Sequence, residues 1–282
     1  MSNQPERSNT ANPASQQHAL GAAPPAGGRA AARPRLASTG GGANRPRRPV
    51  YPTRAPPRAT LAYRLRQSNP DGRLLEGPAT LEWQADPASY SLRLTLQPAD
   101  APARSWISNG VFAVDGVEPR RLVQQDGQRE TRRLELGTAA PGAPARLAAG
   151  SQDRWSWLAQ LAAILEARPR APPAYIDLAV TGLRGTVEQW RFARKDPALA
   201  SALLRSDAGP AFAPGQAARL LMWVKEPDRP YDLRIEAWLD PARHHWPAAL
   251  RLSTPPSRWT FYLHGLDDEH ALHGGQEAAG RR

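Results

Sequence analysis

The chain has 282 residues, of which 30 are proline and 22 are glycine, and it carries a formal net charge of +11. This much proline and glycine is incompatible with a single packed domain over the whole length, so part of the chain is expected to be linker. It has no cysteine, which excludes disulfides, thiolate nucleophiles and cysteine-based metal sites.

The N-terminal segment, residues 1–58, is expected to be a disordered tail or linker. It consists almost entirely of Pro, Gly, Ala, Ser, Asn, Gln and Arg, and has too few large apolar side chains to offset the entropy lost on folding. It also holds nine Arg against the single acid Glu6, which leaves about +3 for the rest of the chain. No apolar run is long enough to form a transmembrane segment, and the N-terminus lacks a signal-peptide pattern.

From Ala59 onward, apolar and polar residues alternate with a period of two, which predicts β-strands. The clearest case is 90–97, where Tyr90, Leu92, Leu94 and Leu96 share one face and polar residues share the other. Asp115-Gly116 and Asp126-Gly127 are good turn dipeptides between strands, as expected for a meander. The same alternation predicts strands over 61–65, 111–114, 120–124, 131–136, 176–181, 186–193, 218–225, 231–239, 249–253 and 258–264.

One segment, 153–167, departs from this alternation and predicts a helix with Asp153 as its N-cap. Apolar residues cover most of its circumference, so it is expected to be enclosed. The predicted fold is mainly β: a large antiparallel curved sheet of roughly ten strands, forming a barrel or half-barrel, packed with one apolar α-helix. A two-sheet sandwich is the alternative. Residues 194–215 are expected to form a long loop with a short helical turn at 197–204, and the domain spans 59–266, followed by a flexible tail at 267–282.

Several segments resemble the bacterial family called domain of unknown function 3108 (DUF3108). The resemblance covers the domain from 59 to 266, and its most specific segment is the helix. The similar segments are Ser105-Trp106-Ile107-Ser108-Asn109-Gly110, Gly116-Val117-Glu118-Pro119-Arg120, residues 152–161, residues 235–240 and residues 246–252. Family members are generally exported or envelope-associated, β-rich and without established activity. The resemblance therefore implies a periplasmic or cell-envelope protein, while the missing anchor leaves a cytoplasmic protein as the alternative.

No nucleophile-elbow, phosphate-loop or dinucleotide motif follows a predicted strand. We therefore expect no catalytic residue, no cofactor and no enzyme activity. His244 and His245 are adjacent, so on a strand they would point to opposite faces and could not bind one metal ion together. A denser group near the C-terminus, His264 to His273, is interpreted as part of a solvated tail, so no metal site is expected.

Four acids lie near the predicted helix and strand faces: Glu82, Asp153, Glu188 and Glu236. Two of them could act as a pair in an envelope-polymer hydrolase, provided that they face one cleft at a suitable separation. The structural interpretation is helix capping for Asp153 and outward positions opposite arginines of neighbouring strands for the other three.

Nine tryptophans are unusual for a chain of this length, and each supplies a large apolar surface with one N–H group. They are interpreted first as core residues and second as the lining of a ligand cavity. The candidate lining residues are Trp83, Trp106, Trp155, Trp157, Trp190 and Trp238.

The leading functional hypothesis is a non-catalytic envelope protein whose curved sheet binds a lipid or other apolar ligand, or an envelope protein partner. The hydrolase is one alternative. The other is a cytoplasmic protein whose basic tail binds nucleic acid weakly; specific nucleic-acid binding is not expected, because Tyr51 is the tail's one aromatic residue.

Overall fold

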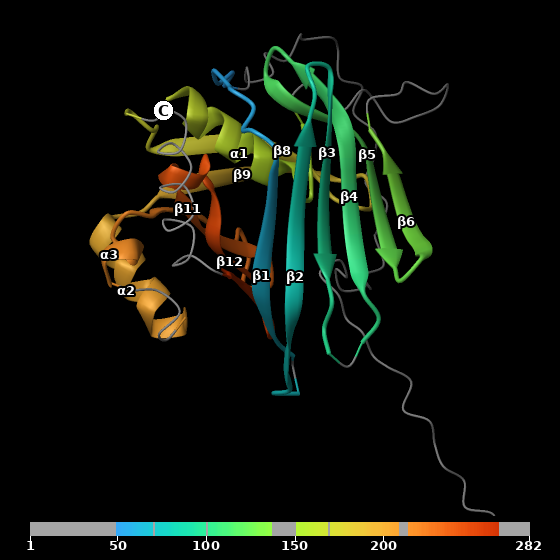
Figure 1. Ribbon diagram of the computed structural model, residues 1–282, viewed down its shortest axis with the longest axis vertical. Coiled ribbons are helices and arrows are strands. Elements are labelled where there is room, and N and C mark those ends of the chain that lie inside the picture. Colours follow the sequence, from blue (N-terminus) through green and yellow to red (C-terminus); the bar gives the residue numbers. More distant parts are fainter. Residues whose placement is uncertain are drawn as a thin grey trace, which may run out of the picture. The chain divides into compact units, whose positions relative to one another are not determined.

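The computed structural model describes residues 49–69, 71–99, 101–136, 151–168, 170–208 and 214–264. Over these residues thirteen strands form one sheet, and three short α-helices accompany it (Figure 1). The helices are α1 (Ser156–Ala167), α2 (Pro197–Ala208) and α3 (Pro214–Ala217). The strands are β1 (Ala59–Ser68), β2 (Leu74–Ala85), β3 (Ser89–Leu96), β4 (Arg104–Ala113), β5 (Gly116–Asp126), β6 (Arg129–Glu135), β7 (Gln152–Asp153), β8 (Tyr175–Thr181), β9 (Val187–Arg194), β10 (Leu221–Lys225), β11 (Arg234–Asp240), β12 (Trp246–Thr254) and β13 (Ser257–Leu263).

The sheet is open, and its strand order is β6-β5-β4-β3-β2-β1-β13-β12-β11-β10-β9-β8-β7. Consecutive strands pair antiparallel, with two exceptions: β6 and β7 do not pair, and β7 pairs parallel with β8. The first strand, β1, pairs antiparallel with the last, β13. The predicted turns form where expected: Gly116 and Gly127 both adopt positive φ in tight connections between strands. The predicted class, a large curved sheet with an apolar helix, is confirmed. The strands number thirteen rather than about ten.

Helix α1 lies against the concave side of this sheet and supplies much of its core. Every residue from Ser156 to Leu165 is buried, so the helix has no wet face over that length. The sheet curls far enough to bring β7, at one end of the strand order, against β5 near the other end. There the Nε2 amide of Gln152 donates to the carbonyl oxygen of Val117 at 2.7 Å. Helix packing and strand curvature therefore depend on each other.

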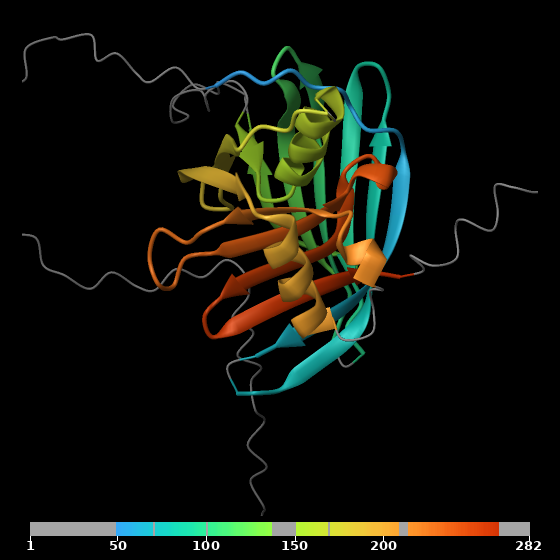
Figure 2. The ribbon, with the colours of Figure 1, turned by 90° about the vertical axis from the view of Figure 1, so that its left-hand side faces the viewer.

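A second, smaller apolar cluster covers the opposite face of the C-terminal strands, where α2 crosses in front of them (Figure 2). Leu204 of α2 packs with Met222, Val224 and Tyr262, and the indole of Trp238 donates to the carbonyl oxygen of Ala200 at 2.9 Å. The sequence predicted mostly loop here. The helix is longer than expected because its apolar residues gain a partner surface that only the folded sheet provides.

Residues 49–58, which the sequence assigned to the tail, run in extended conformation across α1 before β1 begins (Figure 2). We call this segment the strap. The N–H of Arg54 donates to the carbonyl oxygen of Ala163 at 2.9 Å. The indole of Trp83 donates to the carbonyl oxygen of Pro56, and the N–H of Asp177 donates to the hydroxyl of Tyr51. The folded unit therefore begins about ten residues earlier than expected.

Candidate functional site

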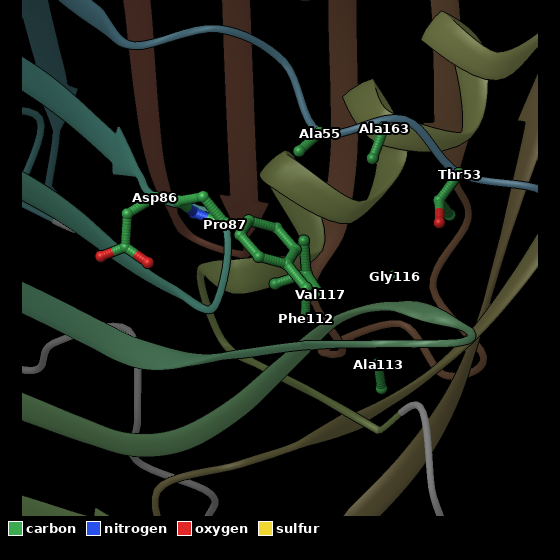
Figure 3. Close-up of a pocket in the computed structure, with 9 residues that line it drawn as sticks. All are labelled: Thr53, Ala55, Asp86, Pro87, Phe112, Ala113, Gly116, Val117 and Ala163. Atoms are coloured by element: carbon green, nitrogen blue, oxygen red, sulfur yellow. The ribbon is translucent and has the colours of Figure 1, made fainter.

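A cavity of about 310 Å³ lies between the strap, the β2–β3 turn, the β4–β5 turn and one side of α1 (Figure 3). Its walls are mostly small or apolar, and it opens to solvent. The lining residues are Thr53, Ala55, Asp86, Pro87, Phe112, Ala113, Gly116, Val117 and Ala163. Its volume is at the lower end of the range usual for small-molecule sites.

Gln160 of α1 holds one wall of this cavity in place. Its Oε1 atom accepts from the N–H of Val117 at 2.8 Å, and its Nε2 donates to the carbonyl oxygen of Asp115 at 2.7 Å. Gly116 sits between these two contacts with φ +102°, and a Cβ there would lie 2.5 Å from Oε1 of Gln160. The β4–β5 turn can therefore close onto the helix only because residue 116 has no side chain.

The entry to α1 is held by the fully buried carboxylate of Asp153. Its Oδ1 accepts from the N–H groups of Trp155 and Ser156, both at 2.8 Å, and its Oδ2 accepts from the hydroxyl of Ser108 at 2.5 Å. The hydroxyl of Tyr90 lies 3.1 Å from the same Ser108 oxygen. Trp155 is the N-cap residue by backbone geometry, so the capping predicted for Asp153 is made from two residues further back.

Burial determines the acid–base properties of this group. Loss of hydration raises the pKa of Asp153, although hydrogen bonds from Ser108, Trp155 and Ser156 act in the opposite direction. Burial also raises the pKa of Tyr90 well above its usual value. Because Asp153 has no exposed surface, it cannot meet a substrate from solvent, and its contacts are those of a helix anchor.

Three of the five segments that carry the DUF3108 resemblance meet in this one region. Ser108 comes from β4, Val117 from β5, and Gln152, Asp153 and Gln160 from β7 and α1. They form a buried set of hydrogen bonds that fastens the helix to two strands. Sequence reasoning did not assign a role to Gln160 or Phe112, and the turn at Gly116 was the one available signal for the cavity wall.

The structure divides the six candidate tryptophans between two faces of the sheet. Five belong to the concave side, where Trp106 packs on Trp155 and Trp157 packs on Trp190, with ring centroids 5.2 and 6.2 Å apart. Trp83 stacks on Tyr90 at 5.2 Å. Trp238 lies on the opposite face beneath α2.

All six side chains are at most 5% exposed to solvent. None of them lines the 310 Å³ cavity. Their role in ligand binding stays a prediction, and the contacts that the structure records are those of core packing.

The four candidate acids do not share a cleft. Glu82 lies opposite Arg93 of the next strand with its side chain partly exposed, as the structural interpretation predicted. Glu236 lies opposite Arg251 as predicted, but its side chain is buried and does not point outward. Glu188 approaches the guanidinium of Arg154 to 4.0 Å and accepts from the indole of Trp190. Asp153 is enclosed at the start of α1. None of the four lines the cavity, whose one acid, Asp86, accepts hydrogen bonds within its own turn from Ala88 and Ser89.

His244 and His245 are placed differently from the sequence expectation. Both adopt positive φ in the turn before β12, so they do not alternate across a strand. Their Nδ1 atoms lie 3.5 and 2.8 Å from the two carboxylate oxygens of Glu166, at the end of α1. Among the described residues no group of three or more metal-type side chains has the arrangement of a metal site. The group from His264 to His273 lies almost wholly outside the described residues.

No helix within the described residues has the combination of length and hydropathy needed to cross a bilayer. Comparison with protein families finds no family model that matches the chain, and no curated protein matches it. Among solved structures, the chain is similar to a β-barrel-like protein of domain of unknown function DUF1849 from Brucella abortus. The two share 11% identity with a TM-score of 0.39, over 75% of this chain and 97% of the other.

Proposed function

We propose that this domain is a non-catalytic binding protein that holds a small apolar ligand, such as one end of an acyl chain, in the cavity beneath the strap. The observation that carries the proposal is the lining. Six of its nine residues are Ala, Pro, Phe or Val: Ala55, Pro87, Phe112, Ala113, Val117 and Ala163. Removing such a ligand from water would be favourable by about 25 cal/mol for each Å² of apolar surface buried.

The chemistry of the walls favours binding over catalysis. The cavity contains neither a nucleophile paired with a base nor two facing carboxylates, which hydrolytic mechanisms need. The side chain of Asp86 is occupied by its own turn, which leaves the hydroxyl of Thr53 as the polar side-chain group available to orient a ligand. An envelope polymer hydrolase is therefore the weaker hypothesis.

A series of saturated fatty acids of increasing length, titrated into the full chain by calorimetry, tests the proposal. We expect saturable binding to one site. Ala55→Phe, which places a ring in the cavity (Figure 3), should abolish it, whereas Leu74→Phe at an exposed site in the β1–β2 hairpin should bind as the wild type does. Equal binding by Ala55→Phe, with its fold intact by circular dichroism, would show that the ligand does not occupy this cavity.

We further propose a cell-envelope location and membership of the DUF3108 family, supported by the residue pattern around Ser108, Gly116 and the helix 156–167. The same residues form the buried anchor of α1, which a related fold would need to keep. Fractionation of cells that express the native gene, with immunodetection of the protein, tests the location. Recovery in the cytosolic fraction alone would contradict it.

A further inference from the structure

The end of the domain that contains the cavity exposes aliphatic side chains where solvent-facing polar groups would be expected. Val114, at the tip of the β4–β5 turn, is 91% exposed, and Val50 of the strap is 66% exposed. The strap and the turn are adjacent, because the Cγ2 of Thr53 lies 2.8 Å from the place that a Cβ on Gly116 would occupy. Ala113 and Gly116, on either side of this tip, both line the cavity.

The strap that runs across this end carries arginine and no acid. Arg54 and Arg58 of the strap are exposed, and no ion pair is recorded for either within the described residues. Residues 1–48, which lead directly into the strap, contain seven Arg and one Glu, a net charge of +6. Two acids, Asp86 and Asp115, lie on the neighbouring β2–β3 and β4–β5 turns. The strap itself carries two arginines and no acid, and by sequence residues 1–58 together hold a net charge of +8.

We propose that this surface, made of Val114, Val50 and the strap arginines, docks on an anionic lipid surface. The inference rests on the proposed function and extends it, because a bilayer would be the source of the acyl chain that the cavity receives. Exposed aliphatic side chains beside a cluster of arginines combine the two interactions that hold a peripheral protein at an anionic membrane. Each is weak alone, and together they place the cavity mouth at the interface.

Nucleic acid is the other polyanion that an arginine-rich segment attracts. It fits this surface less well, because bases are held by stacking on aromatic rings and by hydrogen bonds, whereas valine offers neither. Val114, the most exposed large apolar side chain of the described residues, has no role in binding a phosphate backbone. The side chain of Val114 can instead enter the acyl region of a bilayer.

Co-sedimentation of the full chain with vesicles tests the proposal. Vesicles of phosphatidylcholine alone are compared with an equal mixture of phosphatidylcholine and phosphatidylglycerol, at low and at physiological salt. We expect binding to the anionic vesicles that weakens as salt rises. Val114→Asp should weaken it about tenfold, and Arg54→Ala with Arg58→Ala should weaken it about fivefold for each charge removed.

Leu74→Asp is the matched control, because Leu74 is 50% exposed in the β1–β2 hairpin at the other end of the long strands (Figure 1). It should bind vesicles as the wild type does. Equal binding of Val114→Asp, or a preference for duplex DNA that Val114→Asp leaves unchanged, would overturn the proposal. Ala55→Phe separates the two proposals: it should lose fatty-acid binding and still bind the vesicles. Fatty-acid binding without vesicle binding would refute the docking surface and leave the cavity proposal standing.

Discussion

At the scale of single residues, Asp153 combines a structural task with an energetic cost. Its carboxylate satisfies two N–H groups at the start of α1 and the hydroxyl of Ser108, yet it has no contact with water. Burial raises its pKa in the folded protein. Ionisation of this group is therefore harder in the folded state than in the unfolded chain, where a typical Asp has a pKa of about 3.9.

The sign of the pH dependence follows from that direction. Stability from a raised pKa is fully present below the unfolded value and is lost as pH rises through the folded value. Asp153→Asn keeps an oxygen that can cap the helix and cannot ionise. We expect the free energy of unfolding of the wild type to fall, relative to Asp153→Asn, as pH rises above about 4. Urea unfolding of both proteins across the acidic range measures this, and parallel pH profiles would contradict it.

Gly116 is a second position that decides local structure, because it has no side chain. Gly116 has φ +102°, and Gly116→Ala would place a Cβ 2.5 Å from Oε1 of Gln160. The hydrogen bonds between Gln160 and the β4–β5 turn must therefore break or lengthen. We expect a loss of about 2 kcal/mol or more in the free energy of unfolding. Gly127→Ala is the matched control, since Gly127 has φ +59° with no atom within 4 Å. Its loss should be smaller, and equal losses would show that the contact with Gln160 does not matter.

At the scale of elements, the β11–β12 pair contains a buried ion pair. Arg251 donates to the carboxylate of Glu236 at 2.7 Å, and both side chains are under 10% exposed. Desolvation raises the pKa of Glu236 and lowers the pKa of Arg251, so burial disfavours the charged form of each. The close geometry offsets that cost only while both partners are present.

Removing one partner should therefore be more harmful than removing both. We expect Arg251→Met to lower the free energy of unfolding by about 3 kcal/mol, because Glu236 keeps only its longer contact with Arg234. Adding Glu236→Leu should recover most of this loss. The exposed pair Arg64–Glu76 is the control, in which single substitutions should change stability little. Additive losses in the double-mutant cycle would rule out the coupling.

Comparison of the elements shows which strands and helices could be predicted from sequence patterns. Strands such as β3 and helix α1 were predicted well because their periodicity reflects one buried face or complete enclosure. The strap was missed, and α2 was predicted only as a short helical turn, because the local composition of both is that of a loop. Each is held by partners distant in sequence, Ala163 for the strap and the face around Trp238 for α2.

At the scale of the whole folded unit, Gln152 connects the two ends of the sheet. β7 is the last strand of the order and β5 is the second, so the bond from Gln152 to Val117 bridges nearly the full set of strands. We expect Gln152→Ala to speed hydrogen exchange of amides in β5 and β6 while exchange in β1 and β13 changes little. Gln128→Ala, at an exposed turn position, is the control. If Gln152→Ala changed hydrogen exchange equally in all strands, Gln152 would not be what holds β5 against β7.

The amino-acid sequence by itself determined the strand-rich class, the enclosed helix and the basic character of the tail. Each of these depends on local periodicity or composition, which neighbouring residues express without reference to the fold. Only the tertiary structure decided that Gln160 meets the turn at Gly116, that Trp238 faces away from α1, and that a cavity opens beneath the strap. Those contacts join residues far apart in the chain, and sheet curvature alone brings them within reach.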